Sequence, residues 1–197
     1  MLKTIIYLIL SYFVGAIPFA YIIAKVFKNI DIRKYGSGNP GATNVYRTVS
    51  KPLGILTFIC DALKGFVPVY FVMSISPSSY LIVLAVAFVT ILGHIYTVFL
   101  NFKGGKGVAT GCGIFLAINP AATLICLSVF AIILTISKYV ALASIFAAIT
   151  LPVSLFFLGA ATEVFFFSVI VSIIVVLRHL SNIKRILNGT ENKIFGR

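Results

Sequence analysis

Five apolar runs of about twenty residues each constrain the fold of this chain more than any other feature. They cover residues 4–26, 53–73, 80–101, 139–159 and 162–180. An α-helix needs about 20 consecutive apolar residues to cross the hydrocarbon core of a bilayer. The chain is 60% hydrophobic and only 10% charged, and a soluble domain of 197 residues could not bury that much apolar surface. The sequence therefore predicts an all-α integral membrane protein, with one domain over residues 1–197.

Basic residues gather at particular ends of these runs, and this asymmetry orients the chain. Most lysines and arginines lie in the segments 25–51 and 102–111 and in the tail from Arg178, whereas the segment 74–79 carries no charge. By the positive-inside rule, basic connecting segments are cytoplasmic. We therefore expect the N-terminus outside, and both basic loops and the C-terminus in the cytoplasm.

The stretch 111–137 decides whether this orientation is consistent. A single crossing here would leave the basic C-terminus outside. Asn119 and Pro120 offer a break, because proline lacks the backbone N–H and interrupts a helix. We therefore predict two shorter helices, about 111–118 and 121–136, that enter and return to the cytoplasmic side, giving seven helices of which five are full spans. Six simple spans are the alternative.

The first basic segment contains a loop, Gly36–Arg47 (GSGNPGATNVYR), whose composition suits an anion. Glycine lets backbone N–H groups close on an anion, and Arg47 offers a planar fork for a phosphate. A solvated connector is the alternative, since glycine and asparagine favour turns on steric grounds alone. The residues that make the loop unusual are Gly36, Ser37, Gly38, Asn39, Pro40, Gly41, Thr43 and Asn44.

A second glycine loop lies within residues 102–110 (FKGGKGVAT). It resembles part of a Walker A motif but lacks the spacing of that motif, and it follows a membrane span rather than a strand. Backbone amides and one lysine at the start of a helix still make an anion hole. The residues expected to form it are Gly104, Gly105, Lys106 and Gly107. The alternative is that Lys103 and Lys106 only anchor the span among lipid headgroups.

Acidic residues are scarce, and this restricts the chemistry. The four acids are Asp31, Asp61, Glu163 and Glu191, so neither glycine loop contains a carboxylate. ATP hydrolysis and metal-dependent lipid phosphatase chemistry normally need paired carboxylates for the metal ion. We therefore expect no metal and no cofactor. Asp61 and Lys64 lie one helical turn apart in the second span, which favours a structural ion pair.

The two histidines differ in their expected roles. His94 lies within the third span, roughly two turns from the second glycine loop. A lone histidine in a span usually serves packing or an interhelical hydrogen bond. His179 ends the last run at the cytoplasmic surface, close to Asn182, Lys184 and Arg185, and is the better candidate for chemistry. An interfacial residue near a helix C-terminus is the alternative for His179.

Three segments of the chain, 36–47, 93–110 and 179–191, resemble the three cytoplasmic motifs of the PlsY family of bacterial membrane acyltransferases. The resemblance runs over the whole length, although Thr97 and Asn101 stand where the family usually has proline and glycine. It implies transfer of an acyl chain from acyl phosphate to the 1-hydroxyl of sn-glycerol 3-phosphate. The products would be lysophosphatidic acid and inorganic phosphate, in the first acylation of bacterial phospholipid synthesis. Acyl phosphate is already activated, so this reaction needs neither metal nor ATP.

The resemblance also implies which residues form the site. The catalytic candidates are Ser37, Lys106, His179 and Asn182. The candidates for binding substrate or phosphate are Gly38, Asn39, Thr43, Asn44, Arg47, Gly104, Gly105, Gly107, Ser144, Lys184, Arg185 and Glu191. Lys106 would neutralise charge that develops on the leaving phosphate or on the carbonyl oxygen. Either His179 or the departing phosphate would take the proton from the attacking hydroxyl.

A transporter of phosphorylated solutes is the rival interpretation, because broken helices and anion-binding glycines suit one. Against it, the connectors assigned to the outside have almost no polar groups suited to handling a phosphorylated solute, and the candidate site residues gather on one face. A lipid phosphatase is a third interpretation. For the acyltransferase we expect a multi-pass protein of the bacterial inner membrane with its active site facing the cytoplasm. Its partners would be the two substrates and membrane lipids, with no nucleic acid; the oligomeric state is open.

Overall fold

The structure is a computed structural model that describes residues 2–76 and 79–194. Every regular element within these ranges is a helix, which confirms the predicted all-α class. The chain divides into two compact units, Met1–Ile118 and Asn119–Arg197, and each is described by itself. The expectation of a single domain stays a prediction. Part of the uncharged connector 74–79 and the last basic residue, Arg197, lie outside the described residues.

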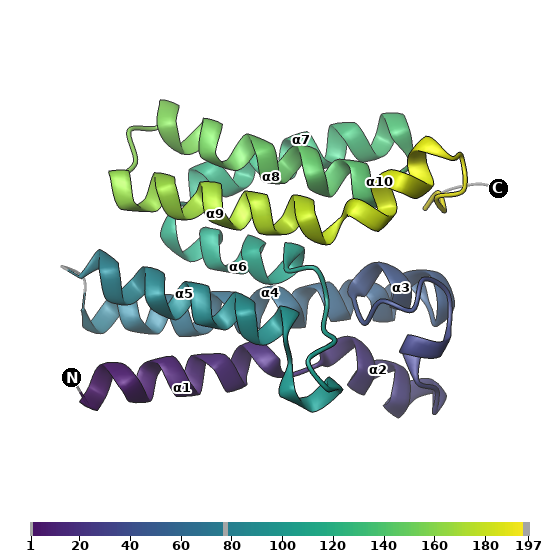
Figure 1. The fold of residues 1–197 in the computed structure, drawn as a ribbon, viewed down its shortest axis with the longest axis horizontal. Coiled ribbons are helices and arrows are strands. Elements are labelled where there is room, and N and C mark those ends of the chain that lie inside the picture. The colour runs from purple at the N-terminus through teal and green to yellow at the C-terminus, as the bar shows by residue number, and fades with distance from the viewer. Residues whose placement is uncertain (1, 77–78, 195–197) are drawn as a thin grey trace. The chain divides into compact units, whose positions relative to one another are not determined.

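The first unit is built around four long helices, with shorter ones at the end where the first glycine loop lies. Figure 1 shows α1 beside α5, and these two helices pack on each other, as α4 packs on α6. Short α3 packs on the start of α4. The elements are α1 (Leu2–Ala16), α2 (Phe19–Lys28), η1 (Ile32–Lys34), α3 (Ala42–Thr48), α4 (Lys51–Ile75), α5 (Tyr80–Ile95), η2 (Val98–Leu100) and α6 (Val108–Ile118).

The second unit consists of three long helices and one short one. Helix α8 packs against both α7 and α9, and α10 continues from α9 after a bend of 51° (Figure 1). The elements are α7 (Pro120–Ser137), α8 (Val140–Phe157), α9 (Thr162–Arg178) and α10 (Leu180–Leu187).

Length and composition make this a multi-pass membrane protein. Within the described ranges, five helical segments are long and apolar enough to cross a bilayer, and the bent pair α9 and α10 passes the same test when taken together. The five segments are Leu2–Lys28, Lys51–Ile75, Tyr80–Leu100, Pro120–Ser137 and Val140–Phe157.

The predicted break between α6 and α7 is present. Helix α6 ends at Ile118, and α7 begins at Pro120. The side-chain oxygen of Asn119 accepts a hydrogen bond from the N–H of Ala122 at 2.9 Å, which satisfies a donor that the helix start leaves unpaired. With 18 residues, α7 is longer than predicted and long enough to span. Its return to the cytoplasmic side stays a prediction.

The first predicted span is one apolar run but two helices, which the sequence analysis missed. Helix α1 ends at Ala16 and α2 begins at Phe19, with Pro18 between them. Proline cannot donate the N–H that would continue the helical ladder. The break lies inside the run 4–26, so backbone carbonyls in the middle of that run lack the partners that a continuous helix would give them.

Glycines bring α1 and α5 unusually close. A Cβ atom added at Gly15 would collide with the carbonyl oxygen of Thr90, and one added at Gly93 would collide with the carbonyl oxygen of Tyr12. Small residues allow such close approach between helices in a bilayer, where association depends on packing. These two contacts set the position of α5 against α1, and hence the position of the second glycine loop near the end of α1.

Gly93→Ala is therefore expected to lower the free energy of unfolding by about 1–3 kcal/mol, because the added methyl group meets backbone that cannot move aside. Thermal unfolding of the purified protein in detergent measures the change. Ala131→Val is the matched control, since it adds apolar atoms at an exposed position of α7. Equal melting temperatures for Gly93→Ala and the parent would contradict the close packing.

Candidate active site

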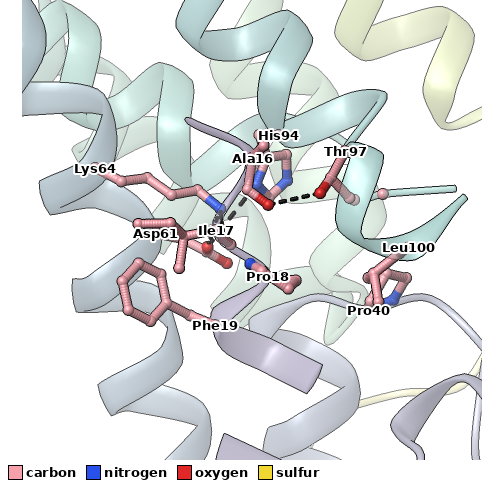
Figure 2. A pocket seen from close by; sticks show the side chains of 12 residues that line it. Ala16, Ile17, Pro18, Phe19, Pro40, Asp61, Lys64, His94, Thr97 and Leu100 are labelled. Carbon is pink, nitrogen blue, oxygen red and sulfur yellow. Dashed lines mark hydrogen bonds and ion pairs between the residues drawn. The ribbon is translucent and has the colours of Figure 1, made fainter. Parts of the chain in front are cut away.

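The two glycine loops lie together in the first unit. Pro40 of the first loop and Gly104 and Gly105 of the second line one pocket, beside the break between α1 and α2. Figure 2 shows Pro40 and Leu100 on one side of this pocket and a charged group on the other. The pocket has room for about one water molecule, so it is too small for a phosphate ester. It marks the place where the loops meet rather than a complete substrate site.

Asn44, in the first turn of α3, organises the first loop. Its side chain is buried, and its oxygen accepts a hydrogen bond from the N–H of Ser37 at 3.0 Å. Its amide group donates to the carbonyl oxygens of Ile32 at 3.1 Å and Tyr35 at 3.0 Å. In this structure the Asn44 side chain closes the loop on itself. The expected part of Asn44 in binding substrate stays a prediction.

Asn44→Asp is expected to destabilise the protein by about 2–4 kcal/mol, because it removes the donor to two carbonyls and buries a charge. Activity should fall with it, since the loop loses its fixed shape. Thermal unfolding and acyl transfer are both measured. Asn101→Asp makes the same change at an exposed position and should be close to neutral. A stable, active Asn44→Asp protein would show that the loop does not depend on this side chain.

The other predicted residues of the first loop lie around this side chain. Gly36 and Gly38 have φ angles of 59° and 72°, in the left-handed region that favours glycine. They flank Ser37, whose side chain is exposed and whose Oγ accepts from the N–H of Asn39 at 3.4 Å. Thr43 and Arg47 lie four residues apart on α3, both partly buried. Among the predicted binding and catalytic residues of this loop, Ser37 is exposed and Gly38, Asn39, Thr43 and Arg47 are partly buried.

An ion pair holds the chain as it enters this loop. The carboxylate of Asp31 accepts from the N–H and the guanidinium of Arg33, with the closest contact at 2.8 Å. The side-chain hydrogen bond from Arg33 lowers the pKa of Asp31 to about 2. A carboxylate with a lowered pKa stabilises the fold when the pH is above the ordinary pKa of that group. This stabilisation is lost as the pH falls through about 2. The entry to the loop is therefore insensitive to pH near neutrality.

The second glycine loop folds back on α5 through two predicted residues. The N–H of Gly104 donates to the carbonyl oxygen of Ile95 at 2.9 Å, and the N–H of Gly105 donates to that of His94 at 3.2 Å. In this structure these two amides are engaged with α5, and the expected part of Gly104 and Gly105 in binding phosphate stays a prediction. Lys106 and Gly107 lead directly into α6, whose first N–H groups lack helical partners and attract anions.

A buried charged group lies at the base of this loop. The predicted ion pair is confirmed: Nζ of Lys64 lies 2.7 Å from Oδ1 of Asp61, and both side chains are 3% exposed. His94 Nδ1 lies 3.8 Å from the same carboxylate oxygen. The expectation that His94 lies two turns from the loop is wrong, because α5 ends at Ile95 and not at residue 101.

Lys64 of this group and the neighbouring Thr97 donate to backbone carbonyls at the break in the first span. Lys64 Nζ donates to the carbonyl oxygen of Ile17 at 2.7 Å, and Oγ1 of Thr97 donates to that of Ala16 at 2.6 Å. Figure 2 shows both bonds as dashed lines meeting the chain at the break. A single sequence reveals the charged pair within an apolar run, but it does not reveal these backbone partners.

In the second unit, His179 lies buried at the bend between α9 and α10. Its Nδ1 lies 2.7 Å from the carbonyl oxygen of Val175. A carbonyl only accepts, so Nδ1 carries the hydrogen in this contact. In the neutral ring Nε2 is then an acceptor, which is the form that can receive a hydrogen bond or a proton from a hydroxyl.

Glu191 holds two of the other predicted residues of this unit. Its carboxylate accepts from Asn182 Nδ2 at 3.0 Å and from Arg185 Nε at 2.7 Å, and its side chain is only 5% exposed. Lys184 is exposed. The hydroxyl of Ser144 donates to the carbonyl oxygen of Val140 in its own helix at 2.8 Å, and its expected part in binding stays a prediction.

Together these features define a class: a multi-pass membrane protein with cation-bearing loops suited to phosphate. The family model described as glycerol-3-phosphate acyltransferase matches residues 5–189. The chain belongs to the glycerol-3-phosphate acyltransferase family.

Individual relatives and solved structures agree with this assignment. A glycerol-3-phosphate acyltransferase of Endomicrobium trichonymphae is 48% identical, covering 98% of this chain and 97% of the relative. One of Fusobacterium nucleatum is 46% identical, covering 95% and 96%. The crystal structure of PlsY, an integral membrane glycerol 3-phosphate acyltransferase, is similar in its glycerol 3-phosphate form with a TM-score of 0.94 and 39% identity, covering 98% and 96%. Its lysophosphatidic acid form gives 0.92 and 38%, with the same coverage.

Proposed function

We propose that this chain transfers an acyl group from acyl phosphate to the 1-hydroxyl of sn-glycerol 3-phosphate, releasing lysophosphatidic acid and inorganic phosphate. The observation that carries the proposal is the likeness over 98% of the chain to PlsY, solved in a glycerol 3-phosphate form and a lysophosphatidic acid form. Glycerol 3-phosphate is the acceptor of an acyl group, and lysophosphatidic acid is the product of that acylation. The chain is an acyltransferase, and glycerol 3-phosphate is its acceptor.

The first unit supplies groups suited to the phosphate of a substrate. Lys106 lies just before α6, so its charge and the partial positive charge of the helix start act at the same place. Negative charge grows on the phosphate as the acyl–oxygen bond breaks, and a nearby cation stabilises that change. Ser37 and Arg47 of the first loop are the further donors that we assign to this step.

The second unit supplies groups suited to the acceptor. His179 presents Nε2 as an acceptor in its neutral form, and Glu191 fixes the amide of Asn182 so that its carbonyl oxygen and remaining N–H point in a set direction. We assign these residues to holding glycerol 3-phosphate while its 1-hydroxyl attacks the acyl carbonyl carbon. The proton of that hydroxyl passes to His179 or to the departing phosphate.

The place of the reaction is the cytoplasmic face of the bacterial inner membrane. The basic segments 25–51 and 102–111 and the tail from Arg178 support this orientation by the positive-inside rule. An acyl phosphate carries its chain in the bilayer, whereas glycerol 3-phosphate arrives from water. Loops at the membrane ends of helices can contact both substrates, because they lie between the bilayer and the water.

Purified protein in detergent, given a long-chain acyl phosphate and glycerol 3-phosphate without vesicles, tests the proposal. We expect lysophosphatidic acid and phosphate in equal amounts, and both should require glycerol 3-phosphate. Phosphate release without the acceptor would point to a phosphatase. No release under any condition would favour a transporter of phosphorylated solutes.

A further inference from the structure

Three ionisable side chains lie buried in the first unit outside the loops themselves. Asp61 and Lys64 come from α4, and His94 comes from the last turn of α5; we call them the buried cluster. Counted over whole residues, Asp61, Lys64 and His94 are 2%, 5% and 6% exposed. Charged groups inside a membrane protein are costly, and an apolar pair of similar volume is often as stable. Stability alone therefore does not account for the buried cluster, and its contacts with neighbouring segments indicate a further role.

The buried cluster is joined to the second glycine loop through His94. The carbonyl oxygen of His94 accepts the N–H of Gly105, and that of the next residue, Ile95, accepts the N–H of Gly104. The imidazole also lies directly against Gly105, because a Cβ atom added there would collide with His94 Nε2. The position of this ring therefore limits where Gly105, and hence Lys106, can lie.

The buried cluster is also joined to the break in the first span. Lys64 donates to the carbonyl oxygen of Ile17 while it pairs with Asp61, and its Nζ lies 5.6 Å from the centre of the Phe19 ring. Asp61 in turn lies between Lys64 and His94. Figure 2 shows these side chains converging on one point from separate helices. One set of contacts thus ties the break between α1 and α2, together with α4 and α5, to the base of the loop.

We propose that Asp61, Lys64 and His94 are positioning residues that set the place of the second glycine loop, and of Lys106 with it, for phosphate binding. This inference rests on the proposed function. The three residues line a pocket with room for about one water molecule, so they act through the loop and not on the substrate. A displacement of about 1 Å at a reacting group can cost about 10²-fold in rate.

A double-mutant cycle tests the contact between His94 and the loop. Gly105→Ala places a methyl group against the imidazole, and we expect kcat/KM to fall by about 10²-fold. His94→Ala removes the ring, so the double variant should be more active than Gly105→Ala alone. Gly104→Ala is the matched control: its methyl group meets the backbone carbonyl of His94, which truncating the side chain does not remove. His94→Ala should not rescue it.

The charged pair is tested by replacing both members together. Asp61→Leu with Lys64→Met removes the charges without leaving one of them unpaired. We expect a lower melting temperature, because the carbonyl oxygen of Ile17 loses its lysine donor, and a fall in kcat/KM of about 10–10²-fold. If the double variant kept the kcat/KM of the parent, the positioning role would be overturned. If this double variant does not fold, the His94 cycle tests the positioning role instead. The role would be overturned if His94→Ala failed to rescue Gly105→Ala just as it fails to rescue Gly104→Ala.

A binding measurement separates this inference from the proposed function. Inorganic phosphate is titrated into the parent and the variants, and the shift in melting temperature is recorded. A parent that transfers no acyl group but binds phosphate, with weaker binding in the variants, would overturn the acyltransferase proposal and support the positioning role. A parent that binds no phosphate, or variants that bind it as well as the parent, would overturn the positioning role.

Discussion

Lys106→Met is expected to lower kcat/KM by about 10²–10³-fold, the size of effect seen when one group that stabilises transition-state charge is removed. The reason is electrostatic. Lys106 precedes the first turn of α6, where unpaired N–H groups already favour an anion, and charge on the leaving phosphate rises during the reaction. Methionine keeps most of the length and the apolar stem of lysine but not the charge. Steady-state kinetics with both substrates varied measures the loss.

Lys103→Met is the matched control for this prediction. It removes a lysine from the same loop, but its side chain is exposed and we assign it no part in the site. Both variants change the net charge equally, so a general loss of attraction for anionic lipid or substrate would affect both. Equal activities for the two variants would mean that Lys106 only anchors the loop among headgroups.

His179→Ala is expected to lower kcat/KM for glycerol 3-phosphate by at least about 10²-fold, since general bases typically contribute about 10²–10⁴-fold. The ring is buried, and the hydrogen on Nδ1 is directed to the carbonyl oxygen of Val175. We assign Nε2, the acceptor nitrogen of the neutral ring, to the attacking hydroxyl. The kinetics of the variant are compared with those of Leu180→Ala, an exposed neighbour that should behave like the parent.

The division of the loss between kcat and KM assigns the role of His179. A fall in kcat with little change in the KM for glycerol 3-phosphate would identify His179 as the base. A loss confined to KM would leave proton removal to the departing phosphate and make His179 a binding residue. Unchanged kinetics would remove His179 from the site altogether.

Features of the fold that depend on composition and short range could be predicted from the sequence. The apolar runs define most of the spans, and Asn119 with Pro120 defines the break before α7 because both the cap and the missing donor are local. The Asp61 and Lys64 pair follows from their spacing on one helix. These predictions needed no knowledge of how the helices pack.

Features that depend on partners distant in the chain could not be predicted. Pro18 breaks the first span in this structure, whereas Pro68 lies inside α4 without ending it, and the difference rests on which tertiary donors and packing each site finds. Nor does the sequence reveal that α5 stops at Ile95, so that its last carbonyls take up the amides of Gly104 and Gly105.

Within the candidate site the same distinction applies. The loop composition drew attention to Asn44, but a polar side chain can face a ligand or its own backbone, and only the structure shows its hydrogen bonds to Ser37, Ile32 and Tyr35. Glu191 was expected to support the site. The way in which it holds both Asn182 and Arg185 depends on the turn that follows α10.

The break at Pro18 has a consequence for how the chain is made. The carbonyl oxygen of Ile17 accepts from the nearby N–H of Phe19 and from Lys64, 47 residues further along, whereas that of Ala16 accepts from Thr97, 81 residues further along. During synthesis the first segment reaches the bilayer before Lys64 and Thr97 exist, so the carbonyl of Ala16 needs water or another donor until Thr97 arrives. The N-terminal segment therefore settles at its final depth only after the third hydrophobic segment has been delivered. Membrane integration of this unit is thus a joint event rather than the insertion of one helix after another.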